Sequence, residues 1–149
     1  MNSPEIMQED FSVHYTYTRS TGPVIGDFLT ALRDRKQILG IKGSDGRTLV
    51  PPMEFDPITT EALSEMVEVS DAGTVTSFCW VKNPISHHHI QHPFAFATIR
   101  LEGADTDLIH MVDCIDESKV SVGSKVKARW ADERTGTMTD IVAFDVTGD

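Results

Sequence analysis

The sequence predicts a mainly β protein in which one helix precedes a small barrel. Three patterns support this prediction. Residues 74–82 are rich in β-branched and aromatic side chains, residues 94–101 alternate in polarity, and the long helical pattern at residues 23–39 lies before the strands. Because no helical pattern separates the later strands, β-α-β units are excluded. The expected fold is a five-stranded Greek-key barrel of the OB type.

The chain begins with a polar segment that leads into the helix. Residues 1–22 are expected to form an N-terminal arm, and the β-prone patch at residues 11–18 fits either an extended arm or an edge strand. Apolar residues then recur at helical spacing, with Thr21 as the expected N-cap. The helix is expected to span Pro23–Leu39 and to end at Gly40.

The segment after the helix is interrupted by glycine, proline and aspartate. Residues 40–60 are therefore predicted to form a small module built from loops, and neither a regular helix nor the centre of a sheet. Residues 61–69 fit either a short helical turn or an entering strand, and both alternatives stay open. The expected domain organisation is an arm at 1–22, a helix with the loop module at 23–69, and a barrel at 70–149.

Five strands are expected in the barrel. They are predicted at residues 74–82, 94–101, 108–112, 120–130 and 140–146, with turns at 103–105 and 134–139. In the second strand, the odd-numbered residues 95–101 point to one face and the even-numbered residues 94–100 to the other. This alternation is typical of a strand with one buried face.

Composition limits the function. The 149 residues contain 13 Lys and Arg against 23 Asp and Glu, a net charge of −10, and no basic stripe that could neutralise a polyanion. Nucleic-acid binding is therefore not expected. No apolar run approaches the ~20 residues of a membrane span, and the N-terminus lacks a signal-peptide pattern, so a cytoplasmic location without membrane contact is expected. Cys79 and Cys114 are expected to be buried, reduced thiols.

A histidine cluster is the most conspicuous candidate for chemistry. Its members are His87, His88, His89 and His92. Imidazoles at this density can bind zinc, nickel or copper, but successive strand residues point to opposite faces, and no acidic partner follows at metal-binding spacing. A solvated loop or a partner-contact surface is therefore favoured. A metal-dependent enzyme stays as an alternative.

Other catalytic patterns are missing from the sequence. There is no Gly-x-Ser-x-Gly elbow, Walker A motif or dinucleotide-binding fingerprint. Cys79 lies in an expected core strand, where inert burial is favoured over nucleophilic reactivity. Phe94, Phe96 and Trp130 could stack bases on an OB face, but they are expected to fill the barrel. The residues thus indicate a binding module without catalytic residues, and a nucleic-acid-binding OB module stays as a second alternative.

Six segments carry a wider resemblance. In order they are FLTALRDRKQILGIKG, GRTLVPP, DAGTVTSFCWV, HPFAFATIRLEGADTDLIHMV, VSVGSKVKARW and IVAFDV, from Phe28 to Val146. The fourth places His92-Pro93-Phe94 before a strand that ends in an acidic-Gly turn, and the fifth contains Val-x-x-Gly-x-x-Val. In this order they resemble the acyl-CoA-associated OB-fold family, whose members carry a rubredoxin-like zinc ribbon and accompany thiolase-like enzymes.

The resemblance implies a ribbon with two C-x2-C pairs, and this chain departs from it. Matching on Asp45-Gly46 and on Pro51-Pro52 places the four ligand positions at Lys42, Asp45, Asp56 and Thr59. Because none is cysteine and lysine is normally cationic, a tetrahedral thiolate site is not expected, and no zinc or other cofactor is expected. The segment is expected either to persist as a metal-free, degenerate zinc-ribbon-like knuckle or to have loosened into a partner-binding loop.

The resemblance further implies a non-catalytic accessory subunit, in a hetero-oligomer with a thiolase-like enzyme. That enzyme would be an aldolase, another carbon–carbon lyase or an acyltransferase acting on acyl-CoA, for example in steroid side-chain degradation. The expected interface residues are Phe28, Leu32, Pro51, Pro52, His87, His88, His89 and His92. The residues expected to meet CoA phosphates are Arg33, Arg35, Lys36 and Lys42. A solvated helix end explains these basic residues equally well.

Overall fold

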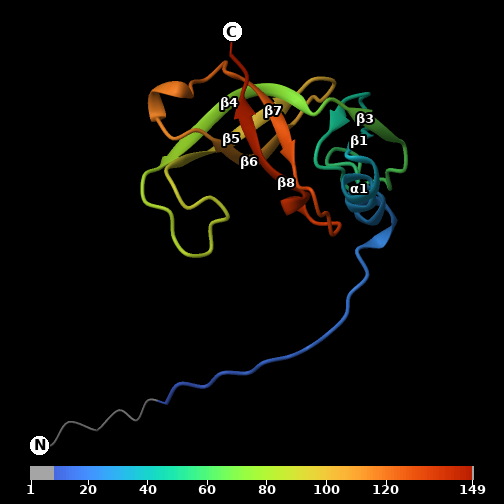
Figure 1. The fold of residues 1–149 in the computed structure, drawn as a ribbon. Helices are drawn as coiled ribbons and strands as arrows, with labels where there is room; N and C mark the ends of the chain where they lie inside the picture. Colours follow the sequence, from blue (N-terminus) through green and yellow to red (C-terminus); the bar gives the residue numbers. More distant parts are fainter. Residues whose placement is uncertain (1–8, 149) are drawn as a thin grey trace, which may run out of the picture.

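The computed structural model describes residues 9–148, in which a helix with a small sheet packs beside a barrel (Figure 1). The elements are α1 (Gly22–Arg35), β1 (Ile38–Lys42), β2 (Thr48–Leu49), β3 (Met66–Val69), β4 (Ala72–Val81), β5 (Phe94–Leu101), β6 (Asp107–Asp113), the 3-10 helix η1 (Glu117–Lys119), β7 (Lys125–Trp130), the 3-10 helix η2 (Met138–Asp140) and β8 (Ile141–Val146). The fold is mainly β with an OB-like, closed five-stranded barrel, as the sequence predicts.

Helix α1 is shorter than expected because the chain reverses at Lys36. This residue has left-handed backbone angles (φ 53°, ψ 43°), and its amide donates to the Ala31 carbonyl, which closes the last turn. The prediction that the helix continues to Leu39 is therefore wrong. Leu39 is instead part of β1, where it pairs with Glu68 of β3.

The segment after α1 forms a three-stranded sheet in the order β2-β1-β3. The prediction that residues 40–60 contain no sheet centre is wrong, because β1 is the central strand. Gly40 does not end the helix; it lies within β1, where a Cβ atom would come within 2.8 Å of Thr48 Cγ2. A glycine is needed for this close approach. The open choice for residues 61–69 is settled in favour of a strand, β3.

Residues 9–20 form an extended arm that runs away from the body (blue in Figure 1). They contain no strand, and Phe11, Tyr15 and Tyr17 are exposed. Of the two alternatives left by the sequence, the structure therefore shows an arm and no edge strand.

The barrel closes in the order β4-β5-β6-β8-β7. All neighbouring strands are antiparallel except β6 and β8, which pair in parallel and so close the Greek key. Alternation in β5 is as predicted: Ala95, Ala97 and Ile99 are buried inside, where they pack with residues of the helix such as Leu32 in one core. The core thus joins α1 to the barrel.

Two sequence expectations about single side chains need correction. Cys79 is exposed, although Cys114 is buried, and both thiols are free. Cys79 pairs across the ladder with Phe96, which is also exposed, because both lie on the outward face of the sheet. Phe96 therefore does not fill the barrel, whereas Phe94 is fully buried in a small second cluster and Trp130 packs against the main core.

Candidate partner interface

An apolar hollow lies between α1 and the loop that precedes β8. It has a volume of about 410 Å³ and is lined by Ile25, Phe28, Leu29, Pro51, Gly136, Thr137 and Met138. No lining residue carries a charge. Helix α1 provides one wall because Ile25, Phe28 and Leu29 are spaced three and four residues apart and so share a face.

The opposite wall is fixed by a buried carboxylate. Asp140 accepts hydrogen bonds from the amides of Thr135 (2.8 Å), Gly136 (2.8 Å) and Thr137 (3.3 Å). Arg134 then ties the loop to the helix, because its Nε donates to the Arg33 carbonyl at 2.7 Å. These contacts hold Met138 at the edge of the hollow.

A smaller hollow of about 190 Å³ continues across the barrel. It is lined by Phe96, Ile109, His110, Met111, Met138, Thr139 and Ile141. Since Met138 lines both hollows, they adjoin. Burial lowers the pKa of His110, which favours the neutral imidazole, so this part of the surface is uncharged at neutral pH.

We call the exposed and half-exposed apolar residues along these two hollows the apolar strip. Its members are Ile25, Leu29, Pro51, Phe96, Ile109 and Met138. The chain carries a net charge of −10, so an uncharged strip of this extent contrasts with the rest of its composition. Contiguous apolar surface of this kind is typical of protein–protein interfaces.

The predicted interface residues are spread over the strip, the core and the histidine loop. Phe28 and Pro51 line the larger hollow, whereas Leu32 and Pro52 are buried. The half-exposed Ile25 and Met138 and the exposed Ile109 were not among the predicted interface residues. Ile109 is exposed between the buried Leu108 and His110 of β6, but residues 108–112 are apolar apart from His110, so no alternation in the sequence marks it as outward-facing.

The histidine loop, residues 82–93, lies at the other end of the barrel from α1 (Figure 1). His88 is half-buried and packs edge-on against Phe96 of the strip, with 5.7 Å between ring centroids. His87 and His89 are exposed, and His92 Nε2 lies 3.3 Å from Asp113 Oδ1. Within residues 9–148, no group of three His, Cys, Asp or Glu side chains could hold a metal ion.

The four predicted CoA-contacting residues do not form one cluster. The exposed Arg33 pairs with Asp34, and Arg35 Nε donates to Gln37 at 2.6 Å. Lys36 caps the same helix end. The Lys42 ammonium is held elsewhere, because it donates to Thr48 Oγ1 at 2.7 Å within the β1–β2 hairpin.

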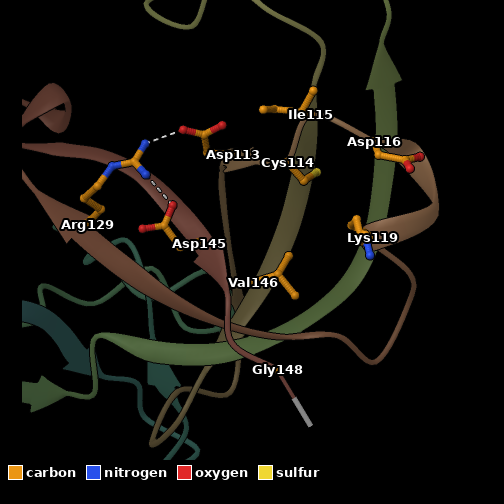
Figure 2. Close-up of a pocket in the computed structure, with 9 residues that line it drawn as sticks. All are labelled: Asp113, Cys114, Ile115, Asp116, Lys119, Arg129, Asp145, Val146 and Gly148. Atoms are coloured by element: carbon orange, nitrogen blue, oxygen red, sulfur yellow. Dashed lines mark hydrogen bonds and ion pairs between the residues drawn. The ribbon is translucent and has the colours of Figure 1, made fainter.

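A third, larger cavity of about 620 Å³ opens at the end of the barrel (Figure 2). One wall of the cavity is charged, because Arg129 forms ion pairs with both Asp113 and Asp145. Cys114 also lines the cavity. Burial raises the pKa of this thiol, so the reactive thiolate is disfavoured. The Cys114 Sγ contacts the Val112 carbonyl, which is not a base that could activate it.

The four positions that the resemblance matches to zinc ligands carry other kinds of side chain. Lys42 faces Thr48, and both carboxylate oxygens of Asp56 accept hydrogen bonds from backbone amides. With Asp45 and Thr59, the donors are an ammonium, two carboxylates and a hydroxyl. These residues do not fit a structural zinc ion, which takes four thiolate or imidazole ligands.

Comparison with known proteins defines the class of the barrel. Residues 66–131 match the family model described as the C-terminal OB-fold domain of ChsH2. The barrel is therefore similar to ChsH2-like OB-fold domains over these residues. No curated protein sequence matches the chain.

Two solved structures share the fold. One is a DUF35-family protein from Sulfolobus solfataricus, with a TM-score of 0.62 and 23% identity over 87% of this chain and 85% of that chain. The other is titled Ltp2-ChsH2(DUF35) aldolase, with a TM-score of 0.59 and 17% identity over 80% of this chain and 91% of the matched chain.

Among the described residues, no helix is long and apolar enough to span a membrane.

Proposed function

We propose that this chain is a non-catalytic accessory subunit that binds a thiolase-like enzyme acting on acyl-CoA thioesters. The observation that carries the proposal is the uncharged apolar strip on an otherwise acidic ChsH2-like protein. A structure of the same fold is titled as part of an aldolase, which favours a carbon–carbon lyase as the partner. The partner would supply the catalytic groups, and both proteins would work in the cytoplasm.

The strip gives the partner a definite place to bind. It crosses α1, η2 and the outer face of β5 and β6, so one partner surface could cover both hollows. His88 extends the strip through its contact with Phe96. Burying these side chains would favour association by about 25 cal/mol for each Å² of apolar surface removed from water, before the entropic and desolvation costs of binding are subtracted.

The acyl-CoA would be held mainly by the partner. Arg33, Arg35 and Lys36 lie at the C-terminal end of α1, and Arg33 lies next to Gly136 of the larger hollow. These residues could contact CoA phosphates at the edge of the interface. Lys42 is the weaker candidate of the four because its ammonium is already bound by Thr48. The acyl group would lie in the partner. A steroid side chain that the partner shortens is one example of such a group.

The proposal is tested by reconstitution. The full chain is purified from its native host under mild conditions, and the proteins bound to it are identified. The expected partner is a thiolase-like protein, and acyl-CoA cleavage or acyl transfer should require both proteins. Turnover by the chain alone, or a purified chain that binds no thiolase-like protein, would refute the proposal.

A further inference from the structure

The ribbon-like segment, residues 42–66, contains two tight loops that are far apart in sequence. Lys42 and Met66 begin and end it, and both belong to strands of the small sheet. At its base, the Lys42 amide donates to the Glu65 carbonyl at 2.9 Å. Apart from the short strand β2, the segment has little regular structure, so side-chain contacts are needed to connect the two loops.

Each loop is closed by its own backbone. In the first loop, Gly43 N donates to the Arg47 carbonyl at 2.8 Å, and Gly46 N donates back to the Gly43 carbonyl at 3.0 Å. In the second, Asp56 N donates to the Glu61 carbonyl at 2.8 Å. These bonds form each loop but do not connect one loop with the other.

The Asp56 side chain makes the connection. Its Oδ2 accepts a hydrogen bond from the Ser44 amide of the first loop at 2.7 Å. Its Oδ1 accepts from the amides of Ile58 (2.7 Å) and Thr59 (3.0 Å) in the second loop. Asp56 is only 2% exposed, so water does not compete freely for these bonds.

We propose that the Asp56 carboxylate links the two loops in the way that a bound metal links the loops of a zinc ribbon, so that the ribbon-like segment folds without a metal. The donor set described above does not fit zinc, whereas the carboxylate satisfies amides from both loops at once. We call these three hydrogen bonds the Asp56 bridge.

Two further observations agree with the bridge. The three amides lower the pKa of Asp56 to about 2, so the carboxylate is ionised at neutral pH and its hydrogen bonds are charge-assisted. Gly43 leaves room for it, since a Cβ atom there would lie 3.2 Å from Asp56 Oδ2 and 3.2 Å from Asp45 Oδ1. Any larger residue at position 43 would crowd the carboxylates.

The experiment measures amide hydrogen exchange in the full chain and in the variant Asp56→Ala. The amides of Ser44, Ile58 and Thr59 should lose protection by at least about tenfold, because each loses a charged acceptor. Amides in the barrel, such as that of Ile99, should not change. The matched control is Asp45→Ala, because the Asp45 carboxylate binds only Arg47 of its own loop and should leave Ile58 and Thr59 protected.

Metal dependence is measured separately on the native protein, prepared without a metal-binding tag. A chelator should leave its melting temperature unchanged, and elemental analysis should find no stoichiometric zinc. A melting temperature that falls with chelator and recovers with zinc would overturn the proposal, as would unchanged protection of the three amides in Asp56→Ala. If Asp56→Ala does not fold, Asp56→Asn takes its place. If neither Asp56 variant folds while Asp45→Ala does, this result supports the proposal, because the segment then requires the Asp56 carboxylate to fold.

A converse variant tests whether the loops have ribbon geometry. Replacing the four matched positions together (Lys42→Cys, Asp45→Cys, Asp56→Cys, Thr59→Cys) removes the bridge and adds two C-x2-C pairs. This variant should melt near the native temperature with zinc and well below it with chelator. Equal melting temperatures in both conditions would contradict the proposed correspondence. The bridge involves this chain alone, so these results do not depend on whether a partner enzyme binds.

Discussion

Replacing the buried carboxylate behind the apolar strip should destabilise the protein measurably. Asp140 is 2% exposed and accepts three amide hydrogen bonds, two of them at 2.8 Å. In Asp140→Ala these amides lose their acceptor. Each unsatisfied buried donor costs ~1–3 kcal/mol, but the 3.3 Å bond is weak and water can enter the loop. A total loss of about 2–4 kcal/mol is therefore expected.

The assay is reversible unfolding in urea, followed by tryptophan fluorescence, with thermal unfolding as a second measurement. A loss of this size corresponds to a melting temperature lower by roughly 5–15 °C for a chain of this length. Asp132→Ala, an exposed aspartate in the same loop, should change the free energy of unfolding by less than about 0.5 kcal/mol. Equal effects of the two variants would refute the reasoning, because of these two aspartates only Asp140 is buried and accepts the three amide hydrogen bonds.

Three further outcomes are expected. Gly73→Ala should destabilise the barrel strongly in urea unfolding, because a Cβ atom there would lie 2.5 Å from the Arg100 carbonyl oxygen, whereas Gly148→Ala meets open space and should have no effect. A thiol reagent at pH 8 should modify one cysteine quickly, and Cys79→Ser should abolish this fast phase, because Cys114 is buried and its pKa is raised; two equally fast thiols would contradict this. The free energy of unfolding should fall as the pH drops from about 4 to about 2, because the folded-state pKa of Asp56 is depressed and its stabilisation is lost on protonation. In Asp56→Asn the fall should be shallower, with a residual slope from other carboxylates such as Asp45, whose pKa is also lowered.

The barrel could be predicted from the sequence because its signals are local. Alternation along residues 94–101 predicts β5 with its observed bounds, and the absence of later helices excludes parallel units with crossover helices. The same patterns place Ala97 and Ile99 inside. The parallel β6–β8 pair was not predicted, because no pattern in either strand specifies its partner.

The small sheet could not be predicted in the same way because its signals are tertiary. Gly40 looks like a helix stop, but packing against Thr48 places it at the centre of a sheet. The role of Asp56 was also hidden, because it depends on the Ser44 amide 12 residues away. The apolar strip needs residues from α1, β5, β6 and η2, and no sequence window contains all of them.

The central claim, that the chain binds its partner through the apolar strip, is tested most directly by measuring the affinity of the co-purified thiolase-like enzyme for two matched variants. Ile109 in the strip and Ile115 at the larger cavity are the same residue type and are 69% and 74% exposed. Ile109→Glu should weaken binding at least tenfold, a loss of about 1.4 kcal/mol, because it buries a charge in an apolar interface. Ile115→Glu should bind like the native chain. Normal binding by Ile109→Glu, or loss of binding only in Ile115→Glu, would contradict the account.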